Sequence, residues 1–313
     1  MVDATDVGID DLFAPRTTYP DPDAKDRLAG LVGLDEHREM LGKFLAIAIN
    51  PRSLIQWIES HHPGATDALS TLLRRPPLAV LAGDVGTGKT VLAETIGDSI
   101  ARMEEIPVTL FPMSLSTRGR GRVGEMTQLI TAAFNHVYET AKKYKRNGQK
   151  PTGASILLVD EADALAQSRE ASQMHHEDRA GVNAFIRGVD RFSEPHLPAA
   201  VIMCTNRLNA LDPAIRRRAG ELLVFRRPGD GERRAVLSPT LSALGLSDED
   251  IDLVVDATGA INGRALGCTY SDLTQRLLPG IVMRAFPSHS VSPAAAIDAA
   301  QALKPTPAFE DQS

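Results

Sequence analysis

The sequence predicts an α/β fold, in which a five-stranded parallel sheet with flanking helices is followed by a small all-helical domain. Three observations carry this prediction. Apolar strand-like runs alternate with helical patterns, a glycine-rich loop follows the first run, and only helical patterns occur after Gly229. The strand-like runs cover residues 78–82, 107–112, 155–160, 199–204 and 222–226.

Two helical patterns frame the first strands. One lies between Asp35 and Asn50 and ends at Pro51, because proline lacks the N–H that a continuing helix needs. The other lies between Met126 and Ala141 and is the clearest in the chain, with apolar residues three and four positions apart. We expect this second helix to pack one face on the sheet.

Changes of pattern along the chain predict its domains. Residues 1–28 are rich in Asp, Pro and Thr without a sustained period, so we expect a flexible N-terminal arm. The Gly- and Pro-containing stretch near residue 229 predicts a boundary between a large α/β domain, 29–228, and a small helical lid domain, 229–303. Residues 304–313 are expected to form a disordered tail.

Composition limits the class of protein. The chain has 313 residues, 43% of them hydrophobic and 24% charged, which is typical of a globular protein with room for two domains. Its net charge of −6 disfavours a broad surface for nucleic acid. Two cysteines are too few for a disulfide scaffold, and no apolar stretch approaches the length of a membrane span. We therefore expect a cytoplasmic protein without a membrane partner.

A glycine-rich loop carries the strongest chemical signal. Residues 83–90 read Gly-Asp-Val-Gly-Thr-Gly-Lys-Thr, between an apolar strand and a helical pattern. Glycines allow such a loop to turn its amide N–H groups inward, which makes a binding site for phosphate at a helix N-terminus. Lys89 would reach the β and γ phosphates and Thr90 would place its hydroxyl on Mg²⁺. The sequence thus predicts a nucleoside triphosphate site, with a simple connecting turn as the alternative.

Two carboxylates follow the third strand. Asp160 and Glu161 lie at its carboxyl end, where parallel sheets bind ligands. Asp160 would hold Mg²⁺, and Glu161 would orient and deprotonate the water that attacks the γ phosphate. Asn206 follows the next strand and could bind the same water, although a lone Asn there is more often a turn residue.

Three successive arginines end the motif Leu-Asp-Pro-Ala-Ile-Arg-Arg-Arg at residues 211–218. Such a run is usually a solvated basic turn. A guanidinium offered across a subunit boundary can, however, accelerate phosphoryl transfer by about 10³ to 10⁵.

These motifs, in this order, resemble those of an AAA+ ATPase over about residues 30–285. The resemblance implies an ATP and Mg²⁺ site closed by a neighbouring subunit in a homo-oligomeric ring, usually a hexamer. It makes Asp160 and Glu161 the Walker B pair, Asn206 sensor 1, and Arg217 and Arg218 the arginine fingers. The segment around Val32 and Gly33 resembles the part of the family that contacts adenine. The remaining nucleotide contacts would come from the Walker A loop and the next residue: Gly83, Asp84, Val85, Gly86, Thr87, Gly88, Lys89, Thr90 and Val91.

The lid domain departs from part of the family. Residues 267–273 resemble the Gly-Phe-Ser-Gly-Ala-Asp-Leu element, but Ser271 stands where other branches have a second-sensor arginine. Whether Arg264 or Arg276 takes over that role stays open.

A loop after the second strand predicts what the ring acts on. Arg122, Val123 and Gly124 occupy the place at which AAA+ unfoldases present an aromatic-aliphatic-Gly step to the central pore. Arginines 118, 120 and 122 would give the pore a positive lining, which suits an acidic peptide. Single-stranded nucleic acid is the rival ligand, and a plain surface loop is the third interpretation.

The arginine-rich loop is similar to that of bacterial relatives of the pachytene checkpoint ATPases. The resemblance implies a remodeller that pulls an extended terminus of a HORMA-domain protein through its pore, in anti-phage systems that signal with cyclic oligonucleotides. The alternatives are a nucleic-acid-bound switch or loader, and a regulatory ring with negligible turnover. The presence of Glu161 with its hydrolytic partners disfavours the last of these.

Overall fold

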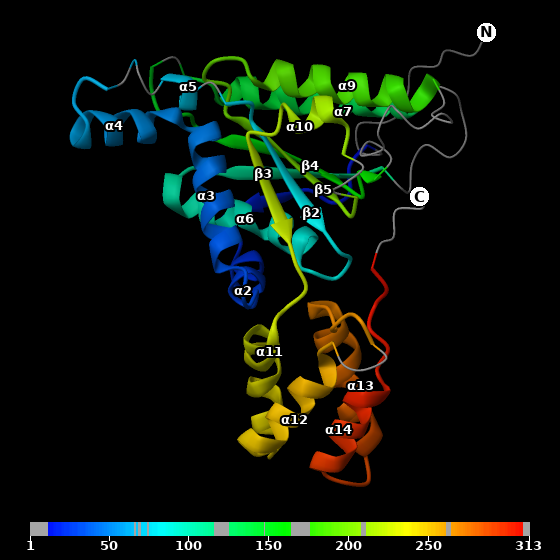
Figure 1. Cartoon of the computed structure of the whole chain (residues 1–313). Coiled ribbons are helices and arrows are strands. Elements are labelled where there is room, and N and C mark those ends of the chain that lie inside the picture. Colours follow the sequence, from blue (N-terminus) through cyan, green and yellow to red (C-terminus); the bar gives the residue numbers. More distant parts are fainter. Residues whose placement is uncertain are drawn as a thin grey trace. The chain divides into compact units, whose positions relative to one another are not determined.

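The computed structural model describes residues 12–65, 67, 70–73, 75–115, 125–146, 148–163, 176–207, 211–260 and 264–308 (Figure 1). The chain divides into two compact units. The first, here called the sheet unit, comprises Met1–Ala29, His37–Ala82 and Thr90–Leu223. The second, the lid unit, comprises Gly30–Glu36, Gly83–Lys89 and Val224–Ser313, so that the glycine-rich loop clusters with the lid helices. The predicted domain ranges stay a prediction.

The sheet contains the five expected strands. They are β2 (Leu78–Gly83), β3 (Val108–Ser114), β4 (Ala154–Asp160), β5 (Ala199–Thr205) and β6 (Glu221–Phe225). Strands β3, β4, β5 and β2 pair in parallel in that order, and β6 lies beside β2 at the edge. The parallel register brings the carboxyl ends of β4, β5 and β2 to one edge, where the predicted chemical residues lie.

A sixth strand lies within the range of the predicted flexible arm. Residues Thr17–Tyr19 form β1, which pairs antiparallel with β3, and Pro22–Ala29 form helix α2. Tyr19 is 1% exposed, with its ring against Gly97. The described part of the arm is therefore built into the sheet unit, since the burial of its few apolar side chains offsets the cost of ordering it. A strand of three residues is too short to show a period.

Helices cover both faces of the sheet (Figure 1). Helices α7 and α9 lie on one face and bury a shared aromatic cluster, in which the Phe134 ring meets those of Phe185 and Phe192. Helices α3 and α6 lie on the other face. Besides α2, the described helices of the sheet unit are α3 (Asp35–Ile49), α4 (Pro51–His61), α5 (Ser70–Leu73), α6 (Lys89–Glu104), α7 (Glu125–Tyr144), α9 (His176–Phe192) and α10 (Pro213–Arg216). Both predicted helices are confirmed.

The lid unit is helical after β6, as predicted. It consists of α11 (Asp230–Ala243), α12 (Asp248–Thr258), a π-helical stretch η1 (Asp272–Leu277), α13 (Leu278–Ala285) and α14 (Pro293–Ala302) around an apolar core. Within the range of the predicted tail, Thr306 hydrogen-bonds to Asp272 of the unit. Across the described ranges, the structure contains no helix that is long and apolar enough to span a bilayer.

Candidate nucleotide site

The glycine-rich loop has a backbone that only glycine accommodates. Gly83, Gly86 and Gly88 have φ values of 152°, 76° and 95°, which side-chain-bearing residues rarely adopt. A Cβ on Gly83 would also lie 2.1 Å from the carbonyl oxygen of Phe225. The loop leads from the end of β2 to the first residue of α6, Lys89, which is the strand-loop-helix setting that the sequence predicts.

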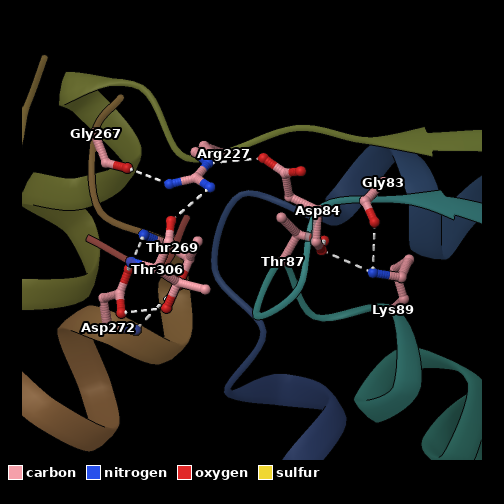
Figure 2. A network of polar contacts seen from close by, with 9 residues as sticks. All are labelled: Gly83, Asp84, Thr87, Lys89, Arg227, Gly267, Thr269, Asp272 and Thr306. Atoms are coloured by element: carbon pink, nitrogen blue, oxygen red, sulfur yellow. Dashed lines mark hydrogen bonds and ion pairs between the residues drawn. The ribbon is translucent and has the colours of Figure 1, made fainter. Parts of the chain in front are cut away.

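Lys89 closes the loop on itself (Figure 2). Its Nζ donates hydrogen bonds to the carbonyl oxygens of Gly83, at 2.8 Å, and Asp84, at 2.7 Å. The Thr87 hydroxyl donates to the same Asp84 oxygen at 2.8 Å. A buried ammonium, glycines that free the loop amides and a helix N-terminus together fit a polyphosphate. Val85 is exposed and Val91 half-buried.

The lid meets the loop directly. The Ser271 amide donates to the Gly86 carbonyl at 3.1 Å, and a Cβ on Gly86 would lie 2.7 Å from the Thr269 hydroxyl. Neither candidate for the missing second-sensor arginine reaches the loop within the described residues. Arg264 donates to the carbonyls of Ala257, Gly259 and Leu303, and Arg276 pairs with Asp272 at 2.6 Å.

The predicted adenine segment packs against lid residues that sequence reasoning missed. Gly33 has a φ of 73°, and a Cβ there would lie 2.7 Å from the Tyr270 hydroxyl and 3.0 Å from Glu232. Burial and the Glu232 charge raise the pKa of Tyr270 to about 12, so its hydroxyl stays protonated at neutral pH. Val32, beside Gly33, is half-buried. The only sequence signal for Tyr270 was its place in the lid motif.

In the sheet unit, the two predicted Mg²⁺ ligands lie close together. The Thr90 hydroxyl donates to Asp160 Oδ1 at 3.4 Å. Burial raises the pKa of the Asp160 carboxyl, while hydrogen bonds from the Glu161 amide and the Thr90 hydroxyl oppose that rise. A hydroxyl and a carboxylate are hard oxygen donors of the kind that Mg²⁺ prefers, so this pair fits the ion.

Glu161 has an unusual backbone for its position. Its φ is 52°, in the left-handed region, and its amide donates to Asp160 Oδ1 at 2.8 Å. A non-glycine residue in this region stores strain, which is common at functional sites. The turn holds an exposed carboxylate just beyond the end of β4.

Asn206 is oriented by a residue to which the sequence assigned no role. Asp163 accepts hydrogen bonds from the Thr205 hydroxyl at 2.8 Å, the Asn206 amide at 2.7 Å and Asn206 Nδ2 at 3.1 Å. Because Nδ2 is engaged, the side-chain oxygen of Asn206 is the atom that can accept a hydrogen bond from a water. The sequence signal that could have identified Asp163 was its position, three residues after Asp160 and just beyond the same strand.

The two predicted arginine fingers differ. Arg218 forms a two-point ion pair with Asp190, at 2.7 and 3.1 Å, which raises the pKa of the guanidinium. The exposed side chain of Arg217 has no partner in the part of the chain that the structure covers. The Asp212 side chain accepts from the Ala214 amide at 2.7 Å and so fixes the turn before both arginines. Arg122, Val123 and Gly124 lie outside the described residues.

Comparison with known proteins agrees with this geometry. Residues 79–227 match the model of the ATPase family associated with various cellular activities (AAA). CD-NTase-associated protein 6 of Escherichia coli strain MS 115-1 is 55% identical over 304 residues, which cover 97% of this chain and 98% of that protein.

Solved structures give the same assignment. A chain of the E. coli MS115-1 HORMA:CdnC:Trip13 complex matches with a TM-score of 0.88 and 54% identity, covering 95% of this chain and 97% of that chain. Rhizobiales Trip13 matches with a TM-score of 0.74 and 50% identity, covering 94% and 99%. With the loop, the Asp-Glu strand end and a relative this similar over nearly its whole length, the chain belongs to the AAA family of ATPases.

Proposed function

We propose that this chain is an ATP-driven remodeller of a HORMA-domain protein in a CD-NTase anti-phage system of the cytoplasm. The observation that carries the proposal is the 54% identity, over 95% of this chain, to a chain of the complex that contains HORMA and CdnC. A match that covers 95% of this chain includes parts of both units and so is not limited to the ATPase motifs. Disassembling a complex that contains HORMA would switch off the enzyme that the HORMA protein activates.

The site supports hydrolysis by a direct water attack. The loop amides and Lys89 would hold the β and γ phosphates, and Glu161 would accept a proton from the water as its oxygen bonds to the γ phosphorus. The bond between that phosphorus and the β–γ bridging oxygen breaks, which yields ADP and phosphate. Mg²⁺, held by Thr90 and Asp160, would supply neutralisation of phosphate charge. Asn206 would orient the water.

Assembly would complete the site. Arg217 of a neighbouring subunit in a homo-hexamer would reach the γ phosphate and stabilise its transition-state charge. Hydrolysis around the ring would then move the loops that carry Arg122, Val123 and Gly124 past an extended terminus of the substrate. The charge of Arg122 in place of an aromatic side chain favours an acidic terminal segment.

The test is a trap. Glu161→Gln should retain ATP and stop hydrolysis, so that the ring stays closed on its substrate. Purified from the native host with ATP and Mg²⁺, this variant should carry a stoichiometric HORMA-domain protein, identified by mass spectrometry. Lys89→Ala, which removes nucleotide binding, is the matched control and should carry none. Nuclease-sensitive nucleic acid on the trap instead would replace the proposal with the switch or loader function.

A further inference from the structure

The segment after α14, residues 303–308, connects to the nucleotide loop through one arginine (Figure 2). Arg227, which follows β6, donates to three acceptors from three parts of the chain. Its Nε bonds Asp84 Oδ2 at 2.8 Å, its Nη1 the Gly267 carbonyl at 2.9 Å, and its Nη2 the Thr306 carbonyl at 2.8 Å. Loop, lid and C-terminal segment thus share a single guanidinium.

A buried carboxylate holds Thr306 from its other side. Asp272, which is fully buried, accepts from the Thr306 amide at 2.9 Å and from the Thr306 hydroxyl at 2.7 Å. The same carboxylate accepts from the Thr269 amide at 3.0 Å, two residues before the Ser271 amide that bonds the loop. Thr306 therefore contributes all three of its main hydrogen-bonding groups to this network.

At the loop end of the network lies Asp84, whose carbonyl oxygen accepts a hydrogen bond from Lys89, the proposed phosphate-binding residue. Asp84 offers its carboxylate to Arg227 and its carbonyl oxygen to both Lys89 and Thr87. The Arg227 and Asp84 side chains are only 10% and 27% exposed, so solvent screens their pairing little. Displacing Arg227 would release the Asp84 side chain and with it the carbonyl that orients Lys89.

We propose that Thr306 is a positioning residue for ATP binding: the C-terminal segment holds Arg227 against Asp84 and so keeps the Gly83–Lys89 loop in the conformation that receives the triphosphate. The proposal rests on the assignment of that loop as the nucleotide site. It assigns a role to a segment that the sequence predicts to be a disordered tail. No group of Thr306 takes part in the chemistry, so the effect belongs to nucleotide affinity and not to the hydrolytic step.

Two truncations of the full chain provide the first test. Stopping after Lys304 removes Thr306, whereas stopping after Ala308 keeps it and serves as the matched control. Loss of a charge-assisted hydrogen bond of about 1.4 kcal/mol corresponds to about tenfold in affinity. Compared with the control, we expect the shorter chain to have about tenfold higher KM for ATP and about tenfold higher Kd for a fluorescent ATP analogue. Its kcat should stay within about twofold of the control.

Point variants keep the test sharp if the shorter truncation folds poorly. Thr306→Val removes the hydroxyl bond to Asp272 and should raise KM about threefold, whereas Thr306→Ser retains that bond and should restore the wild-type value. Ser292→Ala removes the side-chain cap of α14, which accepts from the Ala295 amide, and should lower the melting temperature without changing KM. If Ser292→Ala raises KM as Thr306→Val does, the effect is general loosening of the lid and the positioning role is wrong.

Hydrogen exchange at Thr306 provides a second test, because the coupling between two sites is reciprocal. If the segment favours nucleotide binding, nucleotide must stabilise the segment by the same factor. We expect the Thr306 amide to exchange its hydrogen about tenfold more slowly with bound ADP in the intact chain. Failure of the intact chain to bind nucleotide would overturn the proposed function. Normal binding with equal KM in both truncations and unchanged exchange would overturn only this inference.

Discussion

At the scale of single residues, Asn206, the proposed water-orienting group, depends on a second carboxylate. Asp163 holds both the main chain and the side chain of Asn206, at 2.7 and 3.1 Å. An asparagine that orients a water must present its oxygen in one direction, and without the Asp163 carboxylate the amide group would be free to rotate. Asp163 is therefore a positioning residue that acts through Asn206.

This relation predicts a shared kinetic effect. Asp163→Ala and Asn206→Ala should each lower kcat about tenfold or more, and the double variant should lower it no further than the worse single variant, because residues that act as one unit are not additive. Thr205→Val removes the third donor to Asp163 and should leave kcat within about twofold. Steady-state ATPase assays measure all four variants. Additive losses would show that the two residues act separately.

Sequence and structure agree best where chemistry is encoded locally. The residues from Gly83 to Thr90, and the pair Asp160 and Glu161, are each continuous in the sequence and lie at one turn of the backbone. The sequence pattern alone therefore identifies both motifs. Arg227 and Thr306 were not found, because their roles arise from contacts across 143 and 34 residues of sequence, with Asp84 and Asp272 respectively. No local period or motif reports such a contact.

At the scale of elements, β1 is held by close packing on α6. Its last residue, Tyr19, places its ring where a Cβ on Gly97 would lie, 2.3 Å from Tyr19 Cε2. The Tyr19 hydroxyl also donates to the Glu94 carbonyl in the same helix. The five apolar strands were predictable from their composition, whereas β1 depends on this fit between one ring and one glycine.

Substitution of that glycine should be costly. Gly97→Ala forces the Tyr19 ring to move and should lower the free energy of unfolding of the sheet unit by about 1–3 kcal/mol. Gly42→Ala, in α3, places its methyl 3.8 Å from Ile96 and should be neutral or stabilising by up to about 1 kcal/mol. Denaturant unfolding of both variants makes the comparison. Equal destabilisation would contradict the packing argument.

Asp272, the first residue of η1, predicts that the free energy of unfolding depends on pH. Burial, the largest single influence, acts to raise the pKa of Asp272, but hydrogen bonds from Thr269, Thr306 and Arg276 together lower it to about 2. The unfolded chain binds a proton at about pH 4, so the ionised carboxylate stabilises the fold above that pH by about 2 kcal/mol. This stabilisation is lost as the pH falls from about 4 toward 2.

A difference measurement isolates this group from the other acids. Asp272→Asn should be less stable than the wild type at neutral pH. The gap between their free energies of unfolding should narrow by about 1 kcal/mol between about pH 5 and about pH 3, because only the wild type loses the Asp272 contribution. Chemical denaturation at each pH, followed by a probe in the lid unit, gives the two curves. A constant gap would mean that Asp272 titrates normally.

At the scale of the whole molecule, the proposed mechanism divides the groups that hydrolysis requires between two chains. Arg218, predicted as a finger, pairs with Asp190 of its own chain. Arg217 is exposed and without a side-chain partner among the described residues, so of the two predicted fingers it is the one available to a neighbour. The sequence could predict the pair of arginines but not which of them forms an ion pair within its own chain, because Asp190 belongs to a different helix.

The proposed ring makes this division testable. Arg217→Ala should lower kcat by about 10³ without weakening ATP binding, and Lys89→Ala should abolish binding while still presenting Arg217. In an equal mixture of these two inactive chains, a site works when an intact loop meets an intact Arg217, which occurs for about one site in four. ATPase assays should therefore recover about a quarter of wild-type turnover per site. Replacing Lys89→Ala with the double variant Lys89→Ala/Arg217→Ala removes the donated guanidinium and should give no recovery; recovery there, or none in the first mixture, would contradict action between subunits.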